Sequence, residues 1–311
     1  MKQFKEKGTK LANKIQKELT KYGYYANPDI AYHIMAAIST ENPMPILIEG
    51  DAGVGKTSLA KATAEMLDVP LIRVQFYEGI TAEDIQNDYD YQKQLLTISA
   101  IKDNINKNIS DKTTKEAIDY ISNNTDFYGD EFLIKRPLLS SLTQAGRKVL
   151  LLDEIDKTNE EVEYILLEML SEYSVSIPQF GNIKCKEEDR PIVFLTSNGY
   201  RELSDALKRR CMYLYIPHKT KEELTDILFK KVGCSDDFAK KIAECLCSLN
   251  ELSLKHNVSV SEGIAFAKFL TETFGEANVG KAEMLAGVGT IAKTESDMKL
   301  IKEKIQETIK D

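Results

Sequence analysis

Five short runs of aliphatic residues predict buried strands. They are Ile46–Ile48, Leu71–Gln75, Val149–Leu152, Ile192–Thr196 and Met212–Ile216. Helical patterns separate most of these runs, and that rhythm is typical of a parallel α/β sheet. One predicted helix follows the first run, with Leu59 and Thr63 on its apolar face. A second carries apolar residues at helical spacing from Val162 to Leu170, behind a cap expected at Thr158 or Asn159.

The strand signals stop after Pro217. Residues 220–310 contain only helical patterns, four or five of them, with breaks near Gly233, Asn257, Gly275 and Thr294. We therefore expect an α/β domain over residues 1–217 and a smaller all-helical domain over 218–311. A polar, asparagine-rich stretch near 98–130 is interpreted as an insertion between the second and third strands.

The N-terminus combines a basic face with an apolar one. Seven lysines fall within the first 21 residues, around Leu11, Ile15 and Leu19, and this spacing predicts an amphipathic helix. A solvated lysine face on a packed helix explains the pattern; a contact with an anionic membrane or nucleic acid is the alternative.

Composition and charge narrow the function classes. The chain has 311 residues, of which 42% are hydrophobic and 29% charged, as in ordinary soluble proteins. A net charge of -8 argues against nucleic acid as the main partner. No stretch reaches the ~18 apolar residues of a membrane span, and no apolar core follows the basic N-terminus to make a secretory signal. The five scattered cysteines predict neither a disulfide framework nor a zinc site, which fits a reducing cytoplasm.

The first strand leads into a glycine-rich segment that matches G-x-x-x-x-G-K-[ST]. Its glycines let backbone N–H groups face phosphates, and the following helix adds partial positive charge. Lys56 is expected to neutralise the β- and γ-phosphates, and the Thr57 hydroxyl to ligate magnesium. The expected nucleotide-binding residues are Gly50, Asp51, Ala52, Gly53, Val54, Gly55, Lys56, Thr57 and Ser58.

The Val149 run ends in Asp153 and Glu154. In a phosphate-loop protein the strand beside the loop strand supplies an Asp that holds magnesium, usually through water, and this predicts that role for Asp153. Glu154 can polarise the attacking water. Surface acids that cap a strand end are the alternative, but the upstream loop favours catalysis.

Two further segments carry candidate catalytic residues. Asn198 follows the fourth run and could hydrogen-bond the γ-phosphate and the attacking water; a turn or helix cap is the alternative. Arg209 and Arg210 precede the fifth run, and either could reach a neighbouring subunit's nucleotide as an arginine finger. Surface arginines that flank a strand remain the alternative.

Together these segments resemble the AAA+ ATPases, in particular the MoxR branch and its CoxD-like group, which accompanies von Willebrand factor A-domain proteins. The segments that carry the finer resemblance are Ile80–Asp84, Tyr89–Leu95, Phe132–Leu139, Leu151–Lys157, Ile165–Glu172 and Thr196–Cys211. The resemblance implies a five-stranded P-loop domain with a helical lid, ATP and Mg²⁺ as ligands, and a ring, expected to be a hexamer, with ATP between subunits. It makes Lys56 and Thr57 Walker A, Asp153 and Glu154 Walker B, and Asn198 sensor 1. It also favours Arg210 over Arg209 as the finger.

The resemblance also implies finer features and one departure. Gln75 stands where a polar residue of the family engages the catalytic glutamate. Tyr173–Cys185 matches a hairpin ahead of sensor 1, which either serves as scaffold or offers Phe180 to a partner in the pore. AAA+ lids often carry a sensor 2 arginine, but no arginine follows Arg210, and the matching stretch Asn257–Gly263 has no basic residue. A lysine or other lid contact is expected to take that role.

The sequence leaves three functions open, in decreasing order of support, and a fourth is weaker still. The first is an ATP-driven remodelling chaperone in the cytoplasm that acts on a protein client, such as a von Willebrand factor A-domain protein. The second is a regulatory switch with slow turnover, and the third is a DNA-associated motor or loader, disfavoured by the acidic charge. A small-molecule kinase is weaker, because no acceptor pocket is evident.

Overall fold

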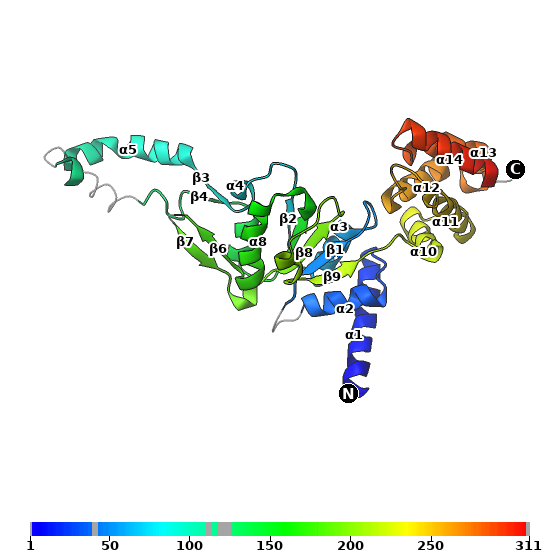
Figure 1. The fold of residues 1–311 in the computed structure, drawn as a ribbon, viewed down its shortest axis with the longest axis horizontal. Helices are drawn as coiled ribbons and strands as arrows, with labels where there is room; N and C mark the ends of the chain where they lie inside the picture. Colours follow the sequence, from blue (N-terminus) through cyan, green and yellow to red (C-terminus); the bar gives the residue numbers. More distant parts are fainter. Residues whose placement is uncertain (1, 39–42, 110–112, 117–125, 179, 309–311) are drawn as a thin grey trace.

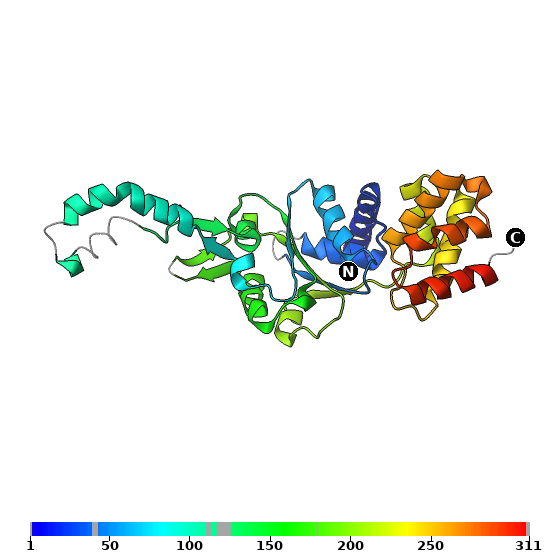
Figure 2. The same cartoon turned by 90° about the horizontal axis from the view of Figure 1, so that it is seen from above.

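The computed structural model describes residues 2–38, 43–109, 113–116, 126–178 and 180–308, with backbone only for 2–7, 101–109 and 308. The molecule is elongated. A central sheet lies between a projecting helix at one end and a cluster of helices at the other (Figures 1 and 2).

The central sheet has five parallel strands in the order β2-β5-β8-β1-β9. Their bounds are Leu71–Gln75, Val149–Asp153, Ile192–Ser197, Ile46–Glu49 and Met212–Tyr215 in that order. All five coincide with the aliphatic runs, so the predicted α/β class with a five-stranded parallel sheet is confirmed. One expectation was wrong: β5 does not lie beside the loop strand β1, because β8 is hydrogen-bonded between them. Strand order depends on long-range pairing, which a local pattern does not encode.

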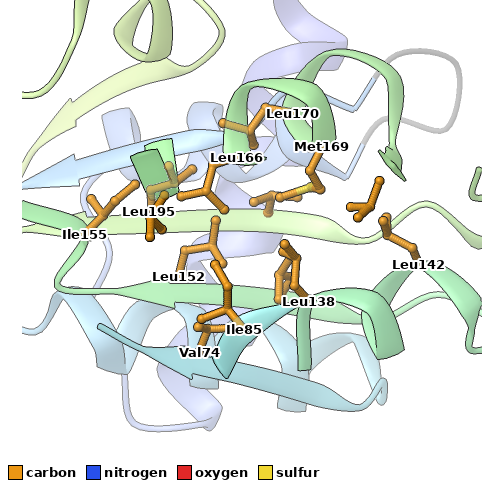
Figure 3. Packing of buried hydrophobic residues seen from close by; sticks show 14 of the residues in the cluster. Val74, Ile85, Leu138, Leu142, Leu152, Ile155, Leu166, Met169, Leu170 and Leu195 are labelled. Carbon is orange, nitrogen blue, oxygen red and sulfur yellow. The ribbon is translucent and has the colours of Figure 1, made fainter. Parts of the chain in front are cut away.

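Successive residues of each strand point to opposite faces of the sheet and belong to two separate cores, because a parallel sheet is covered on both faces. On one face Leu150, Leu152 and Leu195 pack against α7 (Pro137–Thr143) and α8 (Glu160–Glu172), as Figure 3 shows in part. On the other face Leu151 and Phe194 pack with α1 (Lys2–Lys21), α2 (Pro28–Ala37) and α3 (Lys56–Leu67). Asn159 caps α8 by accepting a hydrogen bond from the Val162 amide, which decides between the two expected caps.

The N-terminal helix α1 is present, but its buried face is rotated from the predicted one. Ala12, Ile15 and Leu19 are buried, whereas Leu11 is 44% exposed. Positions 11, 15 and 19 and positions 12, 15 and 19 both share a helix face by spacing. The packing of α1 against α2 and α3 decides between the two sets and leaves Leu11 at the edge of the buried face.

Between α4 (Ala82–Ile85) and α7 the chain makes a long excursion. Strands β3 (Asn87–Tyr89) and β4 (Leu133–Lys135) pair antiparallel, and α5 (Tyr91–Ile109) projects from them, away from the sheet (Figure 1). Part of the predicted insertion, 110–112 and 117–125, lies outside the described residues. The expected hairpin is present as β6 (Ser174–Ile177) and β7 (Gly181–Lys184), and Phe180 is half-buried against the core below it.

After β9 the described chain is helical, as predicted. The elements are α10 (Lys221–Val232), α11 (Asp236–Asn250), α12 (Val260–Phe274), α13 (Lys281–Gly287) and α14 (Glu295–Thr308). They share a core of their own around Phe238, Leu246 and Phe266. Short helical turns at Ile155–Lys157, Asp205–Lys208, Glu187–Asp189, Glu276–Asn278 and Val288–Thr290 complete the described elements. The helix Asp205–Lys208 is α9.

Two predicted absences concern membranes and disulfides. Among the described helices none combines the length and apolarity that crossing a bilayer requires. All five cysteines are free thiols, and burial raises the pKa of Cys211 to about 12 and that of Cys245 to about 11. Such thiols are poor nucleophiles at neutral pH, which fits a packing role.

Candidate functional site

The loop between β1 and α3 takes a shape that demands glycine. Gly53 has a φ of +79°, and a Cβ there would lie 2.1 Å from the Ser259 Cβ at the start of α12. Gly55, with a φ of +103°, precedes the first residue of α3. This loop and the start of α3 line a pocket of about 220 Å³ together with the ends of β5 and β8. We call it the phosphate pocket. The residues around it are Ala52, Gly53, Gly55, Lys56, Thr57, Ser58, Asp153, Glu154, Thr196, Asn198 and Ser261.

Lys56 is buried at the base of the loop. Its Nζ donates hydrogen bonds to the carbonyl oxygens of Gly50 at 2.6 Å and Asp51 at 2.8 Å. Burial lowers the pKa of Lys56, while the nearby carboxylates Asp156, Asp51, Asp153 and Glu154 act in the opposite direction. The ammonium is thus held by backbone carbonyls that an anionic phosphate could replace at lower electrostatic cost.

Asp153 lies at the centre of a polar cluster. Its carboxylate accepts hydrogen bonds from the Thr57 hydroxyl at 2.9 Å and the Thr196 hydroxyl at 2.5 Å. Arg73 of β2 forms an ion pair with it at 2.6 Å. The side chain is 3% exposed, so this carboxylate is fixed in place.

These oxygen donors fit a magnesium ion. A hydroxyl and a carboxylate at the rim of a phosphate pocket are hard ligands, and Mg²⁺ is usually held by one or two such groups plus water and phosphate oxygens. Thr57 is the direct ligand that the arrangement supports. Asp153 already holds three protein donors, which favours a contact through water.

Glu154 has a strained backbone and a shared carboxylate. Its φ of +60° is rare for a residue with a side chain, and its amide donates to the Thr196 hydroxyl at 2.9 Å. The carboxylate accepts from Gln75 Nε2 at 2.9 Å and from Lys157 Nζ at 2.7 Å. The hydrogen bond between Lys157 and Glu154 is the main reason that the pKa of Lys157 is raised. The contact expected for Gln75 is present, whereas the one from Lys157 was missed.

Asn198 lies at the end of β8 with its amide 3.4 Å from the Glu154 carboxylate. Buried Asp156 orients the turn, because one carboxylate oxygen accepts from the backbone amides of Asn198 at 2.9 Å and Tyr200 at 3.0 Å. Asn198 therefore faces the same pocket as the acidic pair. Sequence reasoning missed Asp156, whose signal is its place three residues after Asp153 in a turn that packs on β8.

The structure does not bring Arg209 and Arg210 into the phosphate pocket of their own chain. Both are exposed at the end of α9. Arg210 donates hydrogen bonds to the Ser171 hydroxyl and, at 2.7 Å, to the Ala206 carbonyl. The Arg209 side chain makes no hydrogen bond or ion pair with any described residue.

A second pocket, of about 310 Å³, opens on the other side of the loop. It is lined by Tyr22–Tyr25, by the loop and α3, and by Ile227, Val260 and Ile264 of the helical region. We call it the base pocket. Tyr24 is 6% exposed, and its hydroxyl has no hydrogen-bond partner among the described residues. Burial raises the pKa of Tyr24. A planar ring would fit between the apolar walls of this pocket.

The helical region contacts the loop without an arginine. Ser261 lines both pockets, and Lys219 and Lys231 line the base pocket. No lysine of the helical region is among the described residues of the phosphate pocket. Instead, His218 Nε2 lies 2.6 Å from the Asp51 carboxylate of the loop and links the loop to the start of the helical region.

The comparisons with known proteins place this site in a family. A family model described as AAA domain (dynein-related subfamily) matches residues 45–211. Among solved structures, a RuvB mutant of Thermotoga maritima is 16% identical, with 86% of this chain and 70% of that chain covered and a TM-score of 0.49. The Thermotoga maritima RuvB Holliday junction branch migration motor is also 16% identical, with 85% and 69% covered and a TM-score of 0.48. Comparison with curated proteins gave no match.

Proposed function

The chain belongs to the AAA domain family, dynein-related subfamily, whose members are nucleotide-hydrolysing ATPases, and we propose that it couples Mg²⁺-dependent ATP hydrolysis to the remodelling of a partner protein. The single observation that supports ATP hydrolysis is the convergence of five residues on one pocket: Lys56, Thr57, Asp153, Glu154 and Asn198.

The boundary that we propose between the α/β domain and the helical domain lies between residues 217 and 218.

Each residue then has a defined task. The triphosphate draws the Lys56 ammonium away from the Gly50 and Asp51 carbonyls, because phosphate oxygens carry more negative charge. Thr57 and Asp153 would hold Mg²⁺, which shields the charge of the β- and γ-phosphates. Glu154 polarises the attacking water, and Asn198 orients it against the γ-phosphate.

The adenine is assigned to the base pocket. Val260 and Ile264 offer apolar contact to its ring. Both pockets include residues of α12, so nucleotide binding would fix the helical region against the loop.

The remodelling half rests on the ring that AAA+ proteins typically form and on the sequence segments that resemble the MoxR branch. A hexamer is the proposed ring, with Arg210 as the finger toward the neighbouring subunit and Arg209 as the second candidate. The same resemblance favours a client with a von Willebrand factor A-domain.

Two contacts support a second candidate, a regulatory switch with slow turnover. Gln75 and Lys157 both donate to the same oxygen of the Glu154 carboxylate, and these bonds compete with a water molecule for it. In this alternative, ATP binding alone would govern partner assembly.

Steady-state ATP turnover of wild type and Glu154→Gln separates the two. A remodelling ATPase should lose about 10²- to 10⁴-fold in kcat when the water-polarising carboxylate becomes an amide. ATP affinity should hold, and the variant with ATP should retain a protein client in a pull-down. Equal turnover of wild type and variant would overturn the remodelling proposal in favour of the switch.

A further inference from the structure

A third pocket, which shares no residue with the phosphate pocket or the base pocket, lies where the excursion leaves the α/β domain. It has a volume of about 470 Å³ and lies between α4, β3, the start of α5 and the β6–β7 hairpin. In Figure 1 these elements gather at the end of the molecule that carries α5. We call it the tyrosine pocket, after Tyr89, Tyr91 and Tyr128, which line it.

The three tyrosines form an open aromatic wall. The rings of Tyr89 and Tyr128 meet edge to face, with centroids 5.4 Å apart. The pKa of Tyr89 is raised by burial and then by Tyr128, Tyr91 and Asp126, so these groups lie close together. Tyr91 is 62% and Tyr128 48% exposed, and neither hydroxyl has a hydrogen-bond partner among the described residues.

Two hydrogen bonds fix part of the pocket to the hairpin. Gln86 Nε2 donates to the Ser176 carbonyl at 2.9 Å, and the Tyr89 hydroxyl donates to the Pro178 carbonyl at 3.2 Å. The residue after α4 and strand β3 are thus each joined to the hairpin. This part of the pocket is ordered without a ligand, which lowers the entropic cost of binding.

The pocket is lined by two acidic residues, Glu83 and Asp88. Asp88 is matched by Arg136 at 3.1 Å. Glu83 also lines the pocket, is exposed, and makes no ion pair with any described residue. A carboxylate beside three phenol rings attracts cations through both the ion pair and the ring faces. The same groups repel phosphates, so a nucleotide or nucleic acid does not suit this pocket.

We propose that the tyrosine pocket binds the guanidinium or ammonium side chain of an arginine or lysine presented by a partner protein. The cation lies against Tyr91 and Tyr128 and pairs with Glu83. This binding does not depend on ATP hydrolysis. If the proposed remodelling function holds, the pocket would contact a basic residue of the client protein.

The test is an NMR titration of nucleotide-free protein carrying ring-labelled ¹³C-tyrosine. The probe is Nα-acetyl-arginine methylamide, and its neutral counterpart is the citrulline derivative. Tyr91→Phe and Tyr128→Phe assign the two signals among the 14 tyrosines. Both signals should shift and saturate with the arginine probe, and the citrulline probe should bind at least fivefold more weakly.

Matched variants make the result specific. Glu83→Gln should weaken the arginine probe about threefold and Tyr91→Leu about fivefold, as exposed ion pairs and cation–π contacts allow. The exposed controls Glu78→Gln and Tyr164→Leu should bind it like wild type. Equal shifts with the citrulline probe, or unchanged affinity in both pocket variants, would overturn the proposal. Shifts of the same signals on concentrating the protein alone would do so too, since a second copy would then fill the pocket.

Discussion

The charged side chains of the phosphate pocket and those at the end of α9 differ in how many polar partners they find within their own chain. In the pocket, Lys56, Asp153 and Glu154 each hold hydrogen bonds from or to groups of the same chain. At the end of α9, Arg209 has no polar partner among the described residues, and Arg210 holds only a hydroxyl and a carbonyl. The groups proposed to bind ATP and to polarise water are thus held within one chain. The arginines proposed as fingers lie at an exposed helix end, where a second chain could contact them.

The largest expected effect comes from Arg210→Ala. Kcat should fall about 10³-fold, because an arginine finger stabilises transition-state charge on the γ-phosphate, while ATP affinity changes little. Turnover and the affinity for a fluorescent ATP analogue are measured side by side. Arg209→Ala, the matched control, should lose less than tenfold.

Mixed subunits sharpen the same comparison. Arg210→Ala retains a complete pocket, and Lys56→Ala retains the arginine, so mixing the two inactive proteins should restore part of the activity. Absence of any restored turnover, together with parallel loss of ATP binding in Arg210→Ala, would place the arginine in its own chain's site.

A smaller effect is expected at the contact between the loop and α12. In Gly53→Ala the new methyl group meets Ser259, 2.1 Å from its Cβ, and the positive φ adds a cost of about 1–2 kcal/mol. ATP affinity should fall about tenfold.

The double variant Gly53→Ala/Ser259→Gly removes the steric contact but leaves the backbone cost. Glycine remains an acceptable cap for α12, so Ser259→Gly alone should change ATP affinity little. The double variant should therefore bind ATP more tightly than Gly53→Ala. Identical affinities of the two would show that only the loop's own conformation matters.

Features that depend on consecutive residues, such as strands and the phosphate loop, could be predicted from local sequence patterns. Strand β5 is buried at all five positions, so its aliphatic run was easy to recognise. The phosphate loop was equally accessible, because its chemistry is confined to consecutive residues. Helix α1 was predicted, but the exposure of Leu11 was not, since burial depends on how the helix packs against α2 and α3.

Features assembled from distant segments were out of reach. The insertion of β8 between β1 and β5 follows from long-range pairing, and the β1–β8 partners lie more than a hundred residues apart. The base pocket combines Tyr24 with Ile227 and Val260, which share no motif. The position of Gln75 opposite Glu154 was expected only from the family resemblance, because residues 79 apart carry no common periodicity.

The smallest expected effect concerns Lys157, which donates to the Glu154 carboxylate. Lys157→Met removes a hydrogen bond of 2.7 Å to the Glu154 carboxylate. Such a charged hydrogen bond between half-exposed groups contributes about 0.5–1 kcal/mol. Its loss should free the carboxylate for water and raise kcat about threefold without changing ATP affinity. Lys157→Arg, which keeps the charge, should stay near wild type, and steady-state turnover at saturating ATP checks both. A fall in kcat for Lys157→Met would contradict this expectation. It would mean that Lys157 orients the Glu154 carboxylate for catalysis instead of competing with water for it.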